Sequence, residues 1–378
     1  MGFKCGIIGL PNVGKSTLFN AITQSSIPAE NFPFCTIEPN VGVVEVPDSR
    51  LDELQEIVIA KKVIPTTLNL VDIAGLVKGA SKGEGLGNSF LSNIREMNAL
   101  AHVVRCFDDN NITHVDGEIN STRDAEVINL ELIFADLETL NKRKEKIEKK
   151  LRSGDKDLAN EFNLIENCIK TLESGDFIDI SDFSNKEDLK IIQSFQLLTT
   201  KPIFFIANVS DTKSSKENLD KLKEYAKKMN QEVIEVQIKL EEEIANLDAQ
   251  DKKDFLELEG IEEPALNKII KKGYEILGLD TFFTAGPNEL RAWTLKRGSL
   301  APQAAGRIHT DFERGFIKAE IISFEDYISF GGEAGSKENG KLRLEGKDYI
   351  FKDGDIAHFK FNVWLLLRVN YYFGSMAM

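Results

Sequence analysis

Short apolar runs alternate with amphipathic stretches along most of the chain. Each run has the length of a buried strand, and the runs lie at residues 4–8, 41–46, 68–71, 102–107, 203–207 and 233–236. Helix-like stretches alternate with them, and helix is predicted at 217–229 and again at 263–277, after the last run. Strands that alternate with helices in this way predict an α/β fold with a doubly wound, mostly parallel sheet.

The pattern changes between Val127 and Leu172, where apolar residues recur at helical spacing. The first set comprises Leu130, Ile133, Leu137, Leu140, Ile147 and Leu151. The second set comprises Leu158, Phe162, Ile165, Ile169 and Leu172. Between them, Ser153-Gly154-Asp155 is typical of a turn. We expect two long antiparallel helices that form a hairpin inserted into the α/β domain.

After Gly278 the chain consists of short β-like runs separated by glycines. The runs lie at 290–295, 316–322, 349–351 and 358–363. This pattern predicts a separate, small, β-rich domain.

Composition narrows the function classes. The chain has 378 residues and a net charge of −14, which argues against coating nucleic acid by bulk charge, so no DNA partner is expected. The four cysteines form no C-x-x-C pair, and no apolar run reaches the length of a membrane span. We therefore expect a cytoplasmic protein that does not bind membranes.

One basic cluster departs from this acidic background. It lies in the predicted hairpin and comprises Lys142, Arg143, Lys144, Lys146, Lys149, Lys150 and Arg152. Such a cluster is either a solvated helix face or a contact surface for RNA phosphates, and the sequence leaves both open.

Residues 9–16 read Gly-Leu-Pro-Asn-Val-Gly-Lys-Ser, a complete phosphate-binding loop between the first strand and a helix that continues from Thr17. In such a loop, backbone N–H groups curl around phosphate oxygens at a helix N-terminus. Lys15 can reach the β- and γ-phosphates, and the Ser16 hydroxyl can ligate Mg²⁺. The loop predicts nucleotide binding.

Two further segments favour a nucleotide-dependent switch. The strand at 68–71 ends in Asp72-Ile73-Ala74-Gly75, a D-x-x-G in which Asp72 holds Mg²⁺ through water and the Gly75 N–H senses the γ-phosphate. Glycines at 79, 83, 85 and 87 suit a segment that reorganises with the bound nucleotide. Thr36, between the first helix and the second strand, is a candidate second ligand of Mg²⁺.

The base-recognition loop is expected after the strand at 203–207, where the chain reads Asn208-Val209-Ser210-Asp211. Guanine-specific proteins of this kind carry N-K-x-D, and Val209 replaces that lysine here. Asp211 still permits guanine recognition, so the residues alone leave the base open.

Catalysis also departs from the common pattern. Leu76 follows Gly75 where many GTPases have a water-orienting glutamine, which predicts slow hydrolysis unless another group orients the water. His114, in the polar loop after the fourth strand, is either that group or a solvent-exposed bystander. Asn12 is a candidate for recruiting a monovalent cation near the phosphates.

These motifs together resemble the YchF family of the Obg-related P-loop group. The resemblance rests on Gly9–Ser16, Asn31–Thr36, Asp72–Gly87 with its Leu76, and Asn208–Asp211. The segments Ala301–Gly306, His309–Glu313 and Glu345–Tyr349 are similar to the ubiquitin-like TGS domain of that family.

The resemblance implies an activity and a set of contacts. YchF proteins are ATPases that also bind GTP more weakly, and they associate with ribosomes. Carried over by position, residues 12–17 (Asn12, Val13, Gly14, Lys15, Ser16 and Thr17) cradle the phosphates. Ser16 and Thr36 bind Mg²⁺, and Asn208 and Val209 contact adenine. The family usually has glutamate where Asp211 stands, and aspartate is closer to a guanine reader.

The resemblance also implies a domain plan. Residues 1–128 and 200–278 form the nucleotide-binding domain, 129–199 the inserted helical domain, 279–363 the TGS domain, and 364–378 an unassigned tail. The helical hairpin and the TGS domain flank a positively charged cleft suited to tRNA or rRNA.

The preferred hypothesis is an Mg²⁺-dependent ATPase that acts as a nucleotide-dependent switch on the ribosome or a ribosomal subunit, with Lys15, Asp72, Gly75 and His114 as catalytic candidates. A GTP-specific switch and an RNA-binding module with vestigial hydrolysis are the alternatives.

Overall fold

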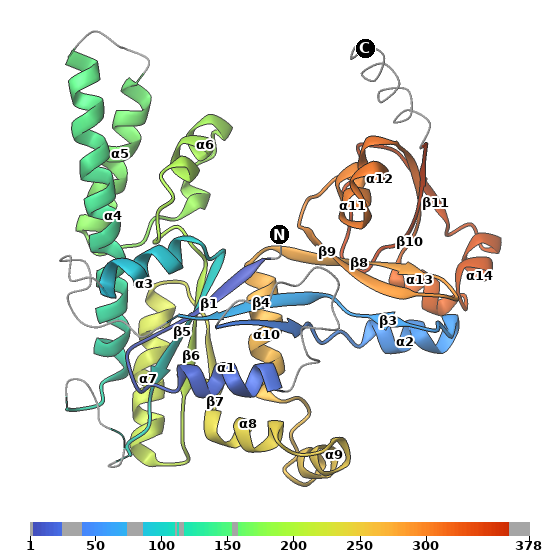
Figure 1. The fold of residues 1–378 in the computed structure, drawn as a ribbon, viewed down its shortest axis with the longest axis horizontal. Helices are drawn as coiled ribbons and strands as arrows, with labels where there is room; N and C mark the ends of the chain where they lie inside the picture. Colours follow the sequence, from blue (N-terminus) through green and yellow to red (C-terminus); the bar gives the residue numbers. More distant parts are fainter. Residues whose placement is uncertain are drawn as a thin grey trace, which may run out of the picture. The chain divides into compact units, whose positions relative to one another are not determined.

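The computed structural model describes residues 3–24, 40–73, 86–109, 112, 117–152 and 158–362, with the side chains of 86–89, 152 and 249 excepted. The chain divides into two compact units (Figure 1). The first unit comprises Met1–Val44 and Asn69–Ile269, and the second comprises Glu45–Leu68 and Ile270–Met378. Each unit is described by itself below.

The first unit is built on a six-stranded sheet in the order β2-β4-β1-β5-β6-β7. Its strands are β1 (Lys4–Ile8), β2 (Val41–Glu45), β4 (Thr67–Asp72), β5 (Ala99–Arg105), β6 (Ile203–Asn208) and β7 (Val233–Val236). The pairs β1–β4, β1–β5, β5–β6 and β6–β7 are all parallel. The predicted α/β fold with a mostly parallel sheet is therefore confirmed.

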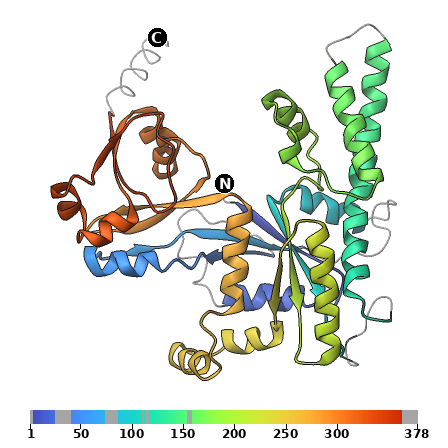
Figure 2. The same cartoon turned by 180° about the vertical axis from the view of Figure 1, so that it is seen from behind.

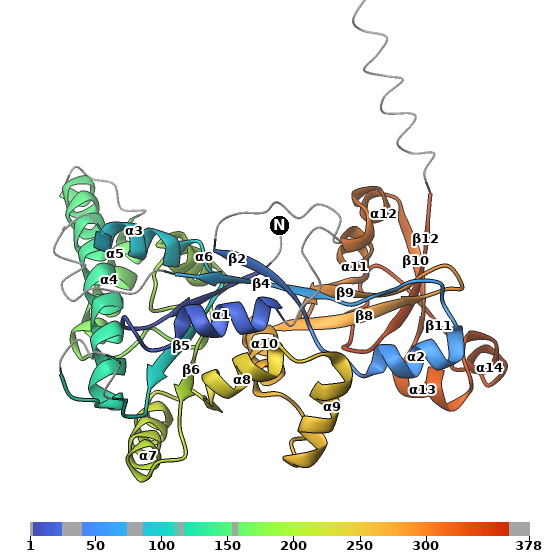
Figure 3. The same ribbon diagram turned by 60° about the horizontal axis from the view of Figure 1, so that its bottom comes forward.

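Helices cover the sheet because its strands β5 and β6 are buried along their whole length, and most of their residues are apolar. The helices of this part are α1 (Lys15–Gln24), α3 (Leu86–Arg95), α7 (Lys213–Lys228), α8 (Ile238–Ala245), α9 (Ala249–Leu258) and α10 (Ala265–Ile276). Leu219 and Leu222 of α7 pack against Phe205 and Val104 of the sheet. Elsewhere, α1 and α8 lie side by side (Figure 3).

A helical insertion separates the neighbouring strands β5 and β6. It contains α4 (Ser121–Arg152), α5 (Ala159–Glu173), the short 3-10 helix η3 (Ile180–Asp182) and α6 (Lys186–Ser194). Figures 1 and 2 show α4 and α5 side by side, projecting beyond the sheet. Their shared core also includes Ile178, Ile192, Phe195 and Leu197, which the sequence analysis did not assign to it.

Leu130 of α4, which the sequence analysis includes in the apolar set, is not buried. Leu130 is 45% exposed, whereas Ile133 and Leu140 lie in the insertion core. The first turns of α4 instead bury Ala125 and Ile128. The apolar face of α4 therefore packs on the sheet at Ala125 and on the insertion core from Ile133, and including Leu130 in the buried set was wrong.

Asp136 anchors the insertion to the start of β6. Its buried carboxylate accepts hydrogen bonds from Leu198 N (2.9 Å), Thr199 N (2.8 Å) and Thr199 Oγ1 (2.7 Å). Burial nevertheless raises the pKa of Asp136, and these three hydrogen bonds act in the opposite direction. The contact fixes how the chain returns from α6 to the sheet.

The second unit holds another six-stranded sheet, in the order β11-β10-β12-β8-β9-β3. Its strands are β3 (Val63–Ile64), β8 (Leu279–Ala285), β9 (Leu290–Lys296), β10 (Phe316–Ile322), β11 (Arg343–Glu345) and β12 (Ile356–Phe361). Its helices are α2 (Arg50–Val58), α11 (Ala301–Ile308), α12 (Thr310–Arg314), α13 (Phe324–Ser329) and α14 (Glu333–Glu338). Alanines of α11 pack on Phe282 and Phe359 of the sheet.

Two features of this unit differ from the sequence analysis. The run at 349–351 is not a strand: Ile350 forms an isolated bridge with Leu300, and Phe351 is buried as a core side chain. Residues 45–68, expected in the nucleotide domain, group with the second unit because Leu51 and Leu54 of α2 pack in its core.

The described helices and cysteines bear on two expectations drawn from composition. Among the described helices, none combines the length and the apolar character that crossing a bilayer requires. The described cysteines, Cys5, Cys106 and Cys168, are buried and unpaired, and burial raises the pKa of each thiol.

The Asp136 anchor gives a stability prediction. We expect Asp136→Ala to lower the free energy of unfolding by about 3 kcal/mol, because two buried N–H groups and one buried hydroxyl lose their acceptor. Urea denaturation followed by circular dichroism measures this loss. Asp220→Ala, at an exposed position of α7, is the matched control and should change stability by less than about 0.5 kcal/mol. Equal stability of the two variants would contradict the anchoring role.

Candidate functional site

The phosphate-binding motif forms a tight loop between β1 and α1, at the carboxyl edge of the sheet. Gly9 has φ +150°, and a Cβ there would lie 2.4 Å from Val103 O. Gly14 has φ +103°, and a Cβ there would lie 2.7 Å from Asn208 Nδ2. Both positions therefore need glycine, for backbone conformation and for space. The loop leads into the N-terminus of α1, where unpaired N–H groups favour an anion.

Lys15 lies inside this loop. Its ammonium donates to Leu10 O at 2.7 Å, and the residue is buried. Burial lowers its pKa to about 8, while the Asp72 carboxylate acts in the opposite direction. A buried cation held by a backbone carbonyl is poised to pair with an anion enclosed by the same loop.

Ser16 and Asp72 meet at the same edge, although 56 residues separate them. The Ser16 hydroxyl donates to Asp72 Oδ2 at 2.8 Å. The other oxygen, Asp72 Oδ1, is buried and has no hydrogen-bond partner in the described part of the chain. A hydroxyl and an unsatisfied carboxylate oxygen form the donor set that Mg²⁺ prefers, so these residues fit such an ion.

The predicted base-recognition segment follows β6 and touches the phosphate loop. Asn208 is buried, its Nδ2 donates to Val13 O (3.0 Å), and its Oδ1 accepts from Ile238 N (3.4 Å). Val209 N donates to Val236 O at 2.9 Å. Asn208 thus ties the phosphate loop to the loop that begins α8.

Asp211 has a partner that the sequence analysis missed. Its Oδ1 accepts from Gln237 Nε2 at 3.1 Å. The contact depends on β6 and β7 being neighbours in the sheet, which the local sequence around Gln237 does not record. The pair places a carboxylate and an amide together beyond the ends of these two strands.

The structure brings part of the predicted site together. Grouped around the loop are Val13, Gly14, Lys15, Ser16, Asp72 and Asn208. Asn12 is exposed, with φ +60°, and Thr17 is half-buried in the first turn of α1. Three predicted site residues, Thr36, Gly75 and His114, lie outside the described residues, as does Leu76.

His102 was not singled out from the sequence, yet it lies behind the loop. It occupies β5 opposite Ile8 and is only 1% exposed. Burial, and next the charge of Lys15, lower its pKa to about 3, so the ring is neutral at physiological pH. Its Nδ1 has no hydrogen-bond partner among the described residues. His102 therefore contributes no positive charge to an anion site.

Arg105 is a second residue that sequence reasoning missed. Its buried guanidinium donates to Phe107 O (3.0 Å), Ile112 O (3.1 Å) and Asp109 O (3.2 Å). The signal available in the sequence was an arginine at the end of a mostly apolar strand. Arg105 holds the start of the loop after β5, the loop in which sequence analysis places His114.

The basic cluster of α4 is partly neutralised within the insertion. Lys142 pairs with Glu138, Arg143 with Glu161 at 2.6 Å, and Lys144 with Glu166 at 2.9 Å. Arg143 also stacks over the Phe195 ring. Lys146 and Lys149 are exposed, and the ion pairs described for this part of the chain do not include them. The free positive charge is thus smaller than the sequence suggested.

Two parts of the sequence match known protein-family models. A family model described as "50S ribosome-binding GTPase" matches residues 4–142. A second model, YchF-GTPase_C, described as "Protein of unknown function (DUF933)", matches residues 279–362. The first match contains the phosphate loop, and the second lies within the second unit.

Relatives match along nearly the whole chain. The ribosome-binding ATPase YchF of Escherichia coli O157:H7 is 55% identical over 364 residues, which cover 96% of this chain and all of the relative. The protein of the same name from Bacillus subtilis is 53% identical over 367 residues. The solved structure of the Schizosaccharomyces pombe YchF GTPase matches with a TM-score of 0.84 and 38% identity, covering 95% of this chain and 98% of that one. With such identity across both units, the chain belongs to the YchF family.

Proposed function

We propose that this protein is an Mg²⁺-dependent ATPase that also binds GTP and that engages ribosomes in a nucleotide-dependent way. The observation that carries the proposal is the buried Lys15 ammonium in the loop between β1 and α1, beside the Ser16–Asp72 pair. The E. coli and B. subtilis relatives are named ribosome-binding ATPases, which supports the same activity and partner here.

The loop residues would act on the triphosphate mainly by positioning and charge. Backbone N–H groups of residues 12–17 would enclose the phosphates, and Lys15 would exchange its bond to Leu10 O for phosphate oxygens. Water would attack the γ-phosphorus in line, with the Gly75 N–H and His114 as candidates for positioning the reacting groups. Asn12 would be the side chain that recruits a monovalent cation.

Ser16, Thr36 and Asp72 are the proposed holders of Mg²⁺. The unsatisfied Asp72 Oδ1 and the neighbouring Ser16 hydroxyl support this assignment. Bound there, Mg²⁺ would neutralise charge that develops on the phosphates during hydrolysis. Asp72 would keep its orientation through the hydrogen bond from Ser16.

Base recognition is assigned to Asn208, Val209 and Asp211, with adenine preferred. Val209 offers no ammonium to pack on a guanine, which favours ATP. Asp211 is the residue that would favour GTP instead, and its bond to Gln237 occupies one of its oxygens. A GTP-specific switch is therefore the second candidate function.

The finer architecture belongs to the same proposal. In the second unit, β8 and β12 are parallel neighbours and α11 packs on the sheet, as in a ubiquitin-like β-grasp, which supports a TGS domain at 279–363. We assign 1–128 and 200–278 to nucleotide binding, apart from residues 45–68, which group with the second unit. We assign 129–199 to an inserted antiparallel helical hairpin, and we place the protein in the cytoplasm. Residues 364–378 receive no function.

Contact with rRNA or tRNA is proposed through the helical insertion and the TGS domain. Lys146 and Lys149 are the exposed cations of α4 best suited to phosphate contacts. If nucleotide state did not affect this contact, the chain would be an RNA-binding module with vestigial hydrolysis.

Nucleotide binding can be tested at Lys15. We expect Lys15→Ala to weaken Mg-ATP binding and to slow hydrolysis by about a hundredfold or more, because the cation inside the loop is lost. Calorimetric titration with ATP and with GTP measures both affinities, and we expect ATP to bind more tightly. Lys253→Ala, at an exposed position of α9, is the matched control. Tenfold tighter binding of GTP would reject the adenine preference, and undiminished hydrolysis by Lys15→Ala would reject the site.

The lowered pKa of Lys15, about 8, predicts a pH dependence. The triphosphate binds the protonated ammonium, so above pH 8 the free protein must first take up a proton. Affinity for a non-hydrolysable ATP analogue should fall by up to about tenfold for each pH unit above 8. Lys15→Arg stays charged throughout and should flatten this profile. An unchanged wild-type affinity from pH 7 to 9.5 would contradict the assignment.

Ribosome engagement is tested by co-sedimentation with ATP, ADP, GTP or no nucleotide. We expect the bound fraction to differ between ATP and ADP. Lys146→Glu with Lys149→Glu should reduce it several-fold, with a weaker salt dependence. Lys227→Glu with Lys228→Glu, on the exposed face of α7, is the matched control. Binding that is equal in all four conditions would favour the RNA-binding module over the switch.

A further inference from the structure

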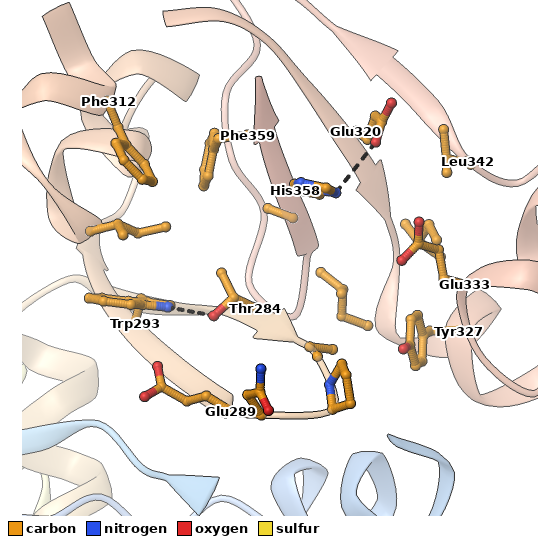
Figure 4. Close-up of a pocket in the computed structure, with 18 of the residues that line it drawn as sticks. Thr284, Glu289, Trp293, Phe312, Glu320, Tyr327, Glu333, Leu342, His358 and Phe359 are labelled. Atoms are coloured by element: carbon orange, nitrogen blue, oxygen red, sulfur yellow. Dashed lines mark hydrogen bonds and ion pairs between the residues drawn. The ribbon is translucent and has the colours of Figure 1, made fainter. Parts of the chain in front are cut away.

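The second unit contains a hollow that the nucleotide chemistry does not use. It has a volume of about 520 Å³, within the range of ligand pockets. It lies among β8, β9, β10 and β12, with α13 and α14 at one side (Figure 4). The turn at 286–289, between β8 and β9, forms part of its rim.

The wall of the hollow is largely aromatic and aliphatic. Trp293, Phe312 and Phe359 line it at one end, and Tyr327 and Leu342 line it at the other (Figure 4). Trp293 Nε1 donates to Thr284 Oγ1 at 2.9 Å, so its polar atom is satisfied within the wall. The wall therefore suits apolar stems and flat, delocalised groups.

Carboxylates predominate among the charged side chains that line the hollow, although His358 lies beside Glu320 and Arg291 lies next to Glu289. Glu289, Glu320 and Glu333 line it, and no lysine or arginine is among its described lining residues. Glu320 and Glu333 lie on the same side of the hollow as His358, and Glu289 lies on the rim (Figure 4). Three carboxylates around an apolar wall repel a phosphate backbone and attract a cation that carries an apolar stem.

The neighbours of these carboxylates favour a guanidinium. Glu320 already pairs with Lys360 at 3.2 Å, so an incoming cation must compete with an ammonium. A planar guanidinium binds a carboxylate through two hydrogen bonds, which an ammonium cannot do. Arg291 stacks 4.0 Å from the centroid of the Trp293 ring, so this aromatic wall already supports guanidinium stacking.

We propose that this hollow binds an arginine-bearing, partly apolar segment of a partner protein. The arginine pairs with Glu320 and Glu333, and its stem packs on the aromatic wall. Glu289, which already faces Arg291 at 3.9 Å, adds negative charge at the rim. The proposal does not depend on the proposed ATPase function, because every lining residue belongs to the second unit.

Tryptophan fluorescence tests the proposal, because the chain has only two tryptophans, Trp293 and Trp364. In full-length protein with Trp364→Phe, Trp293 is the sole reporter. We expect a blocked peptide of alternating arginine and leucine to change its emission saturably. The same peptide with lysine for arginine should bind more weakly, and a uridine oligonucleotide should leave the emission unchanged.

Charge-neutral variants show whether the carboxylates carry the binding. Each of Glu289→Gln, Glu320→Gln and Glu333→Gln should weaken the peptide up to about fivefold, and the triple variant more than tenfold. Glu338→Gln, on α14 but outside the hollow, is the matched control and should match the parent protein. The affinity of the parent should fall with added salt, a second readout that a folding defect in a variant does not produce.

Three results would overturn the proposal. One is equal peptide affinity of the triple variant and the parent, and another is saturable binding of the oligonucleotide with no response to the peptide. The third is tighter peptide binding after Arg368→Ala, which would make the chain's own C-terminal segment the occupant. Peptide binding by Lys15→Ala protein separates this test from the nucleotide site, since it should persist even if hydrolysis is absent.

Discussion

The burial of one ammonium group governs the organisation of the first unit. Lys15 loses hydration inside the loop, and among the described residues Leu10 O and the nearby charge of Asp72 compensate for it. That arrangement leaves the loop rich in donors: the ammonium and the N–H groups at the start of α1. A polyanion would satisfy these donors together, which is why the loop suits the triphosphate of the proposed function.

Side chains from distant segments keep this loop in shape. Asn208 ties Val13 to Ile238, and Gly14 leaves the space that the Asn208 amide occupies. The parallel order of β1, β5 and β6 brings these segments to one edge of the sheet. The proposed base-recognition loop therefore also supports the phosphate loop, and a change at Asn208 would disturb both.

Features determined by neighbouring residues in the sequence were predictable, and features that depend on tertiary packing were not. The strand–loop–helix at residues 4–24 rests on glycine conformation and apolar spacing, which neighbouring residues determine. Leu130 is exposed because it lies between the part of α4 that packs on the sheet and the part that packs in the insertion core. The spacing of apolar residues along one helix does not predict where this change occurs. The Asp211–Gln237 contact likewise depends on β6 and β7 being neighbours in the sheet.

Residues 45–68, which belong to the second unit although the first unit surrounds them in sequence, limit how the chain can be divided into fragments. Between β2 and β4 the chain contributes α2 to the core of the second unit, where Leu51 and Leu54 pack near Phe283 and Tyr327. Arg50 adds an ion pair with Asp353 at 2.7 Å. A fragment that begins at Leu279 would lack this helix and expose apolar surface, and the complementary fragment would carry α2 without its partners. No single cut separates two self-sufficient pieces, so the polypeptide must be studied intact.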